Sequence, residues 1–233
     1  MINFCCVYYG SKYTPEYVQK LYNMVQRHLT VPHEFYCFTD HTNLFDMVTG
    51  KIHFKTFPRH DMEGWWNKLQ LFHPENGLQG VNLYMDLDVV ILKNIDCFAT
   101  HGDDTTFGIT NDFGQPTTIY NSSIMKWNNI NASSLIWDKY YADRPSFRKE
   151  QGDQNVVTNL MKNQPMLLPF PDDWTFSYKW FSRERPRFPK NQWTFEQDMN
   201  AKVAVFHGNP NPHESEQQWV KDCLLYTSPS PRD

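Results

Sequence analysis

The chain has 233 residues, of which 40% are hydrophobic and 16% aromatic, and its formal net charge at pH 7 is −4. This length and apolar content suffice for one sizeable domain and exclude a globally disordered chain. The slight acidic excess makes a broad nucleic-acid-binding surface unexpected, so nucleic acid is an unlikely partner class. We find no apolar run long enough to span a bilayer and no basic-then-apolar leader, and therefore expect a soluble, cytoplasmic protein.

Strand and helix patterns alternate through the first hundred residues. Strands are predicted at 4–9, 34–39, 51–57 and 82–92, and helices at 15–29 and 64–73. Thr14 and Pro15 are typical of a helix N-cap and first helical residue. This β-α-β order predicts an α/β fold with a doubly wound sheet.

The second half of the sequence is less regular. Strands are predicted at 107–110, 122–127 and 201–207, and helices at 134–141 and 153–161. Between them, residues 165–195 are rich in Pro, Trp and basic residues and predict a long ordered loop region. No internal repeat or low-complexity linker divides the chain, so we expect a single domain, residues 1–222.

The segment 223–233 differs in character from everything before it. It resembles the translation of a sequencing-library adapter joined in frame, and it shows neither helical nor strand periodicity. We therefore expect a non-native tail that contributes nothing to the fold, and a natural protein that continues past Asp222.

Two aspartates, Asp86 and Asp88, lie one residue apart in the apolar segment 82–92. Burying two like charges is unfavourable unless they are paired or bind a cation. Residues i and i+2 of a strand point to the same face, so both carboxylates are expected to converge on one ion. Their oxygens suit Mg²⁺ or Mn²⁺, and such a site suits a diphosphate. The alternative is a solvated pair of strand-end aspartates without a ligand.

Other polar residues also follow predicted strands. Ligands of α/β sheets bind outside the carboxyl ends of the strands, which is where this sequence places Tyr8, Tyr9, Gly10, Thr39 and Asp40. Either tyrosine could stack on a pyrimidine ring, and Asp40 could accept a hydrogen bond from the imide N–H of the base. We expect these residues and the aspartate pair to form one site.

Six motifs follow one another in an order typical of one enzyme family. They are the strand 4–10, Gly-Trp-Trp-Asn-Lys-Leu (64–69), Met-Asp-Leu-Asp-Val-Val (85–90), Tyr-Asn-Ser-Ser-Ile-Met (120–125), Gly-Asp-Gln-Asn (152–155) and Phe-His-Gly-Asn-Pro-Asn-Pro (206–212). Together they resemble the GT-A nucleotide-sugar glycosyltransferases, closest to the glycogenin-like family 8 and its phage and bacterial relatives, over roughly residues 2–215.

This resemblance implies a GT-A-like doubly wound mixed sheet with flanking helices. It also implies transfer of a hexose from a nucleotide-sugar donor, UDP-sugar by default, with retention of anomeric configuration. The setting would be a bacterial or phage-infected cytoplasm. The acceptor stays open between a saccharide, a lipid-linked acceptor, a protein and modified phage DNA.

The resemblance further implies a metal centre. Asp88 would bind Mn²⁺ or Mg²⁺ directly, Asp86 would bind the metal and the donor ribose, and His207 would be the third protein ligand. The metal would neutralise the diphosphate leaving group as the glycosidic bond breaks. If so, these three side chains should converge even though His207 is far away in the sequence.

The transferred sugar is expected near Asn121 and the pair Asp153 and Gln154, with Asp153 and Gln154 counted among the catalytic residues. Their amide and carboxylate groups can donate to and accept from sugar hydroxyls. Asp153 could instead be the N-cap of the helix that it opens, or serve both purposes.

The chain departs from the family pattern after His207. A lysine that binds the diphosphate is usual there, and Asn209 and Asn211 stand in its place. Lys68 is then our candidate for charge compensation, with an ordinary solvated helix lysine as the alternative.

Two other functions fit part of the sequence. Asp86-Leu87-Asp88-Val89-Val90 also fits the nucleophile motif of haloacid-dehalogenase-like phosphatases, in which Asp86 would be phosphorylated and Asp88 would be the acid/base. That motif usually closes the first strand of its core, whereas other predicted strands precede it here. A non-catalytic nucleotide-sugar-binding module is the third possibility.

Overall fold

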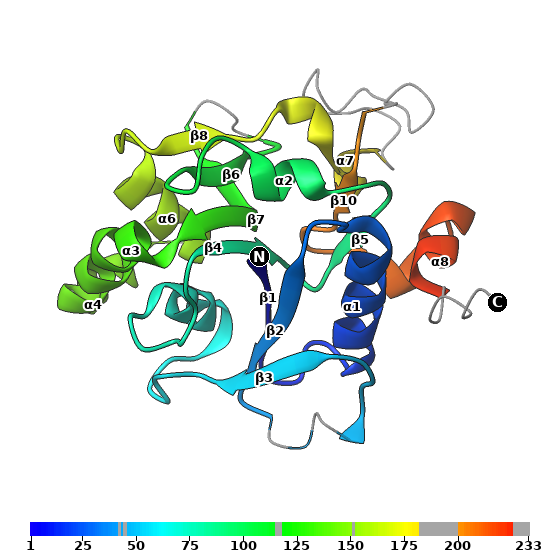
Figure 1. Ribbon diagram of the computed structural model, residues 1–233, viewed down its shortest axis with the longest axis horizontal. Helices are drawn as coiled ribbons and strands as arrows, with labels where there is room; N and C mark the ends of the chain where they lie inside the picture. Colours follow the sequence, from blue (N-terminus) through cyan, green and yellow to red (C-terminus); the bar gives the residue numbers. More distant parts are fainter. Residues whose placement is uncertain (42, 44–45, 115–117, 151, 182–199, 226–233) are drawn as a thin grey trace.

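The computed structural model describes residues 1–233 except 42, 44–45, 115–117, 151, 182–199 and 226–233. Its centre is a mixed seven-stranded sheet of order β3-β2-β1-β4-β7-β6-β8 (Figure 1). The bounds of these strands are β1 Ile2–Tyr8, β2 His33–Thr39, β3 Ile52–Thr56, β4 Val81–Met85, β6 Phe107–Asn111, β7 Tyr120–Asn128 and β8 Leu167–Pro169. Strands β1 to β4 are parallel, β7 is antiparallel to both of its neighbours, and β8 is parallel to β6.

A second, smaller sheet has the order β5-β10-β9. Its strands are β5 Val89–Ile91, β9 Thr175–Ser177 and β10 Val203–Val205. Strand β10 is antiparallel to β5 and parallel to β9. The apolar residues of this small sheet belong to the same core cluster as one face of the large sheet. The two sheets therefore form one unit, and the expected single α/β domain is confirmed.

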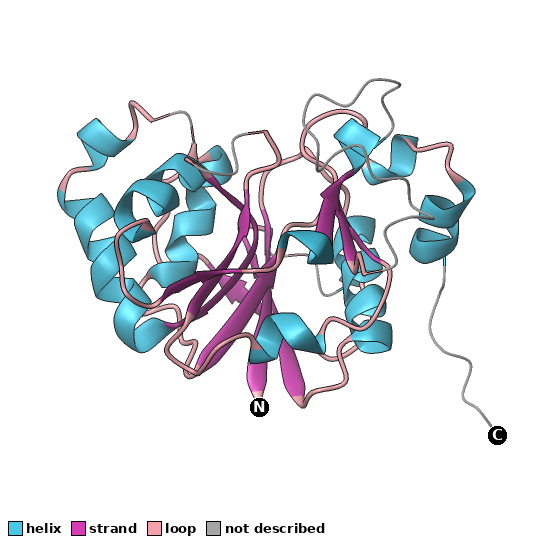
Figure 2. Cartoon of the chain, turned by 90° about the horizontal axis from the view of Figure 1, so that it is seen from above, coloured by secondary structure: helices cyan, strands magenta, loops and turns pink. Residues whose placement is uncertain are grey.

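Helices lie on both sides of the large sheet, as Figure 2 shows. The longer ones are α1 Glu16–His28, η2 Gly64–Phe72, α6 Asp153–Met161 and α8 Gln218–Leu225. The shorter ones are α2 Asp96–Thr100, α3 Asn129–Ala132, η3 Ser133–Asp138, α4 Lys139–Ala142, α5 Arg144–Phe147, η4 Asp172–Trp174, α7 Tyr178–Phe181 and η6 Pro212–Glu214. Among the described residues, no helix is both long and apolar enough to cross a membrane.

Strand β1 shows why the sheet is buried on both faces. Its alternate residues Phe4 and Cys6 pack in the core cluster that includes α1, whereas Cys5 and Val7 pack in the cluster that includes η2 and α6. A strand covered on both sides needs apolar side chains at every position, and this explains its continuous apolar run.

Most predicted elements are confirmed, with differences at their ends. The helix predicted at 64–73 is a 3₁₀ helix, η2, and the helix predicted at 134–141 begins earlier, at Asn129, and contains a π-helical turn, η3. Helix α1 begins at Glu16 with Pro15 at its N-cap, one residue later than predicted, and no side chain caps it.

The prediction of a single strand at 82–92 is wrong. The segment forms β4 and β5, which belong to different sheets, and residues 86–88 turn between them. Strand β4 pairs with β1 and β7, whereas β5 pairs with β10. Because both halves are fully buried, the hydrophobic pattern carries no sign of the break.

Two further predictions need correction. The region 165–195 is not one long loop, because it contains β8, η4, β9 and α7; residues 182–195 lie outside the described part. Helix α8 runs past Asp222 to Leu225, so the segment 223–233 is not without regular structure. Cys223 and Leu224 pack against the core, and the Cys223 carbonyl accepts a hydrogen bond from Arg27 (2.8 Å). The foreign origin of this segment stays a prediction.

Gly108 offers a test of the packing between β6 and the loop after β8. A Cβ atom at this position would lie 2.6 Å from Phe170 Cε1 and 2.7 Å from Phe170 Cζ. Phe170 is buried, and its ring packs on Phe98 and Trp174, so a shift of the ring would disturb both contacts. We expect Gly108→Ala to lower the free energy of unfolding by about 1–3 kcal/mol, measured by urea denaturation.

The double variant Gly108→Ala/Phe170→Leu is the control. It should lose less stability than the sum of the two single changes, because leucine is smaller than Phe170 and removes the clash with the new Cβ atom. Additive losses would show that the Gly108–Phe170 contact is not the cause.

Candidate active site

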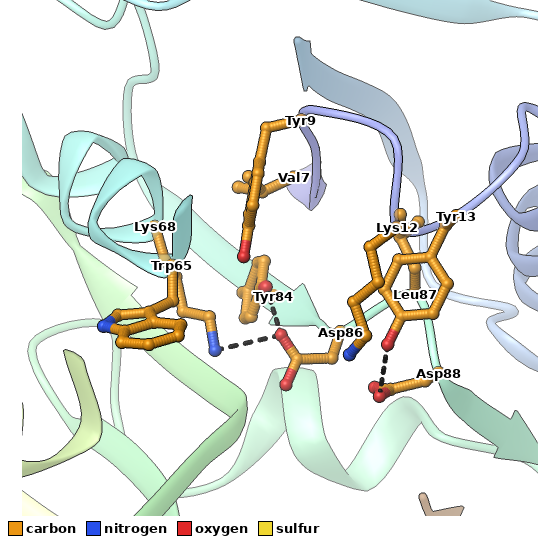
Figure 3. Close-up of a pocket in the computed structure, with 10 residues that line it drawn as sticks. All are labelled: Val7, Tyr9, Lys12, Tyr13, Trp65, Lys68, Tyr84, Asp86, Leu87 and Asp88. Carbon is orange, nitrogen blue, oxygen red and sulfur yellow. Dashed lines mark hydrogen bonds and ion pairs between the residues drawn. The ribbon is translucent and has the colours of Figure 1, made fainter. Parts of the chain in front are cut away.

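A cavity of about 190 Å³ lies at the carboxyl ends of β1 and β4. Figure 3 shows its side chains converging from the loop after β1, from η2 and from the turn after β4. The lining residues are Val7, Tyr9, Lys12, Tyr13, Trp65, Lys68, Tyr84, Asp86, Leu87 and Asp88. This is the edge at which α/β sheets bind ligands, as the sequence predicted.

Asp86 and Asp88 both line this cavity from the turn between β4 and β5. The hydroxyl of Tyr84 donates to Asp86 Oδ1, and Lys68 Nζ lies 3.0 Å from the same oxygen (Figure 3). The hydroxyl of Tyr13 donates to Asp88 Oδ2 over 2.7 Å. Each carboxylate is therefore oriented by a tyrosine from a different part of the chain. The two aspartates share the cavity because of the turn, not because they share one strand face as predicted.

The aspartate pair has an unfavourable electrostatic environment. Asp88 is only 8% exposed. Its burial, and then the charge of Asp86, raise the pKa of Asp88 to about 6, against the opposing effects of the Tyr13 hydrogen bond and of Lys12 and Lys68. Two carboxylates held this way favour a cation between them, since a cation offsets both the desolvation and the repulsion.

Lys68 joins the aspartate pair to helix α6. Its ammonium lies 3.0 Å from Asp86 and 3.1 Å from Asp153, and it donates to the Ser122 hydroxyl (3.3 Å), which in turn donates to Asp153 (2.7 Å). Burial disfavours the charged amine, but the charges of Asp153 and Asp86 and their hydrogen bonds outweigh it, so the pKa of Lys68 is raised.

Lys68 is thus a buried, doubly paired cation and not a solvated helix lysine. Asp153 is not the N-cap of α6 either. That position is Gly152, and the Asp153 carboxylate is used by Lys68 and Ser122.

Of the two candidate stacking tyrosines, Tyr9 lines the cavity and Tyr8 does not. Tyr8 is buried in the core, and its ring packs on His41 with 4.7 Å between the ring centroids. Burial, together with the charges around it, raises the pKa of Tyr9 to about 12, so its hydroxyl stays protonated and can donate.

The loop after β1 is fixed to the end of β2. Gly10 has φ of +57°, which a residue with a side chain rarely adopts, and its N–H donates to the Asp40 carboxylate (3.3 Å). His41 Nε2 lies 2.7 Å from the Gly10 carbonyl oxygen, and its backbone N–H donates to the Thr39 hydroxyl (3.0 Å). Gly10, Thr39 and Asp40 therefore contact one another or His41, but none of the three lines the cavity that holds the aspartate pair. Their predicted role in binding the base stays a prediction.

A second cavity of about 300 Å³ adjoins the first. It is lined by Trp65 and by residues 152–155, which include Asp153 and Gln154. Trp65 lines both cavities and is 52% exposed, although it is an aromatic residue on an otherwise buried helix. Asn121, expected near the sugar, is buried in β7, where its side chain accepts from the Ser123 N–H (3.0 Å).

His207 lies near the aspartates along the backbone but points elsewhere. The N–H of Phe206 donates to the Asp88 carbonyl (3.2 Å). The His207 ring stacks on Phe113, and its Nε2 lies 2.5 Å from the Ser177 hydroxyl. Within the described ranges, no group of three His, Cys, Asp or Glu side chains is placed to hold a metal ion. The predicted convergence is therefore not found, and the metal itself stays a prediction.

Several cavity residues were missed by the sequence analysis. Lys12 and Tyr13 follow β1, so the rule that selected Tyr9 and Gly10 would have found them had it extended further along the loop. Tyr84 precedes the aspartates on β4, inside the apolar segment 82–92, where nothing in the sequence distinguishes it from a core residue. Nothing in the sequence distinguishes the exposed Trp65 from its buried neighbour Trp66.

Comparison with known proteins identifies the fold. No protein-family model matches the chain, and no curated protein matches it in sequence. The glycosyltransferase GlyE of Streptococcus pneumoniae TIGR4 superposes with a TM-score of 0.75 at 12% identity, over 97% of this chain and 61% of that one. This chain thus spans 61% of the length of GlyE.

LgtC is also similar in structure. An active-site mutant of LgtC matches with a TM-score of 0.65 at 13% identity, over 97% of both chains. The galactosyltransferase LgtC in complex with donor and acceptor sugar analogs matches with a TM-score of 0.61 at 13% identity. The chain has the GT-A fold of these enzymes, as the sequence predicted.

The Lys68 contacts predict a large effect of removing its charge. Lys68→Met keeps the length of the side chain but leaves Asp86 and Asp153 without their cation. Breaking a buried ion pair from one side costs about 3–5 kcal/mol, and we expect a loss of this size in the free energy of unfolding, measured by urea denaturation at pH 7.

A matched control is Lys20→Met. Lys20 lies on α1, 3.8 Å from Glu16, in a pair more exposed than that of Lys68. This change should cost less than about 1 kcal/mol. Equal losses in the two variants would contradict the structural role assigned to Lys68.

Proposed function

We propose that this chain is a metal-dependent glycosyltransferase that moves a hexose from a nucleotide-sugar donor, UDP-sugar by default, to an acceptor. The observation that carries the proposal is the position of Asp86 and Asp88 in a cavity at the carboxyl ends of β1 and β4, within a GT-A fold. A fold by itself does not imply an activity, so the residues of the cavity must support it.

The carboxylates that line the cavity fit a hard divalent cation such as Mn²⁺ or Mg²⁺. Carboxylate oxygens are the ligands that these ions prefer. Burial, and then the charge of Asp86, raise the pKa of Asp88, and a bound cation would offset both effects. Asp86 and Asp88 would hold the ion. When bound, it would neutralise the charge that develops on the diphosphate leaving group.

His207 stays our proposed third ligand on the resemblance alone. The hydrogen bond from the Phe206 N–H to the Asp88 carbonyl holds its backbone near the aspartate pair, but its ring contacts Phe113 and Ser177 and would have to turn to reach an ion.

The second cavity is the proposed place for a sugar. Its wall combines the exposed indole of Trp65 with the side chains of Gln154 and Asn155, and sugar rings bind between an aromatic face and amide groups of this kind.

Asp153 is paired with Lys68, so we assign it to positioning rather than to direct attack. LgtC, which shares the fold, has been solved with donor and acceptor sugar analogs, and this likeness supports our proposal of a saccharide acceptor. Retention of configuration stays part of the proposal on the resemblance alone.

No contact favours the phosphatase alternative. The phosphatase motif usually closes the first strand of its core, whereas β1, β2 and β3 precede β4, the strand that leads to Asp86. A binding module without catalysis would share the site proposed here, and it is separated from the enzyme by a turnover assay.

Asp88→Asn is the decisive substitution. It removes a proposed metal-binding charge with almost no change in size. We expect Mn²⁺-dependent hydrolysis of UDP-glucose and UDP-galactose to fall by more than about 100-fold, since loss of a residue that only hydrogen-bonds a metal ligand already costs about 10- to 100-fold. The melting temperature should stay equal or rise, because the raised pKa of Asp88 shows that its charge is unfavourable in the folded state. Turnover within a few-fold of wild type at limiting Mn²⁺ would contradict the proposal.

Trp65→Ala tests the sugar position separately. We expect the affinity for UDP-glucose or UDP-galactose to fall by about 2- to 10-fold, the equivalent of roughly 0.5–1.5 kcal/mol for an aromatic contact, while the affinity for UDP is unchanged. Calorimetric titration with each ligand measures both values. Trp65→Phe should restore part of the difference, and an equal loss for UDP would place Trp65 at the nucleotide instead.

A further inference from the structure

Two lysines line the aspartate cavity, and only one of them is available to a ligand. Lys68 is buried and held between Asp86 and Asp153. Its charge is already balanced by two carboxylates, and movement towards a ligand would leave both of them unpaired. An anion that enters the cavity must therefore be met by another cation.

Lys12 is exposed and lies at the mouth of this cavity, on the loop between β1 and α1. Its Nζ is 4.5 Å from the centre of the Tyr13 ring, and Tyr13 in turn donates to Asp88. Across the described part of the chain, no carboxylate lies within 4.0 Å of the Lys12 ammonium. Figure 3 shows the side chain extending into the cavity on the side of the two aspartates.

The position of Lys12 is defined by its neighbours. The preceding turn is fixed by the Gly10 contacts with Asp40 and His41, and the following residue is fixed by the Tyr13–Asp88 hydrogen bond. A cation over an aromatic face gains about 0.5–1 kcal/mol at an exposed site. This is enough to favour one position and too little to prevent the ammonium from moving to an anion.

We propose that Lys12 binds the diphosphate of the nucleotide-sugar donor, with Tyr13 as the support that holds it at the cavity. The inference rests on the proposed function and adds to it the residue that contacts the phosphates. Asp86 and Asp88 offset much of the charge of a divalent ion bound to them, so such an ion would neutralise only part of the diphosphate charge and a further cation is needed. Lys12 meets this need from the side of the cavity opposite Lys68.

The experiment is calorimetric titration of UDP and of uridine into the full chain with Mn²⁺ present. For Lys12→Met we expect the affinity for UDP to fall by about 10-fold or more, in line with a lost hydrogen bond to a charged group, while the affinity for uridine is unchanged. Lys12→Arg keeps the charge and should stay within about 3-fold of wild type. The melting temperatures of both variants show that they are folded.

Lys20→Met is the matched control. Lys20 also lies over a tyrosine ring, Tyr17, at 5.8 Å, but it does not line the cavity. The Lys20→Met variant should bind UDP with the affinity of the wild type. Lys179→Met tests an alternative residue for binding the diphosphate. Lys179 Nζ lies 3.7 Å from the point that a Cβ atom on Gly208 would occupy, near the end of β10.

Wild-type affinity for UDP in Lys12→Met would overturn the inference and leave the proposed function standing. An equal loss for UDP and uridine, or a loss in Lys179→Met alone, would also overturn it. If the wild-type chain binds neither UDP nor GDP, the proposed function fails, and the inference fails with it.

Discussion

The site depends above all on the ion triad of Lys68, Asp86 and Asp153. One buried ammonium lies 3.0 Å from one carboxylate and 3.1 Å from the other. Removing ions from water costs several kcal/mol for each, and this cost is offset only where opposite charges and further hydrogen bonds are well placed. Because the three residues come from η2, from the turn after β4 and from α6, their contact fixes these three elements beside the two adjoining cavities.

The turn that separates β4 from β5 is the second constraint on the site. Strand β4 is held by β1 and β7, and β5 is held by β10, so both ends of the turn 86–88 are anchored in sheets. The N–H of Asp86 still donates to the Ser123 carbonyl (2.9 Å), which extends the ladder to the first residue of the turn. Functional side chains on so short and anchored a turn are placed more accurately than on a free loop.

Sequence reasoning predicted the large sheet and the edge where the site lies, because buried parallel strands have long apolar runs and their carboxyl ends share one edge. It did not predict that residues 82–92 divide between two sheets, since both halves are buried and the periodicity is uniform. It left the role of Lys68 open, because its partner Asp153 is brought near only by tertiary packing. The exposure of Trp65 beside buried Trp66 is likewise a property of the fold alone.

Asp88 shows where the physical chemistry of folding and that of binding diverge. Its contact with Tyr13 needs only an acceptor oxygen, which an asparagine would supply without charge. The carboxylate instead adds a negative charge that burial and Asp86 both oppose, as its raised pKa reports. A group that is unfavourable for the isolated fold and lies in a cleft is a candidate for function. What the charge of Asp88 adds beyond hydrogen bonding is attraction for a cation, and this supports the proposed role of the residue in ligand binding over a role in the stability of the turn.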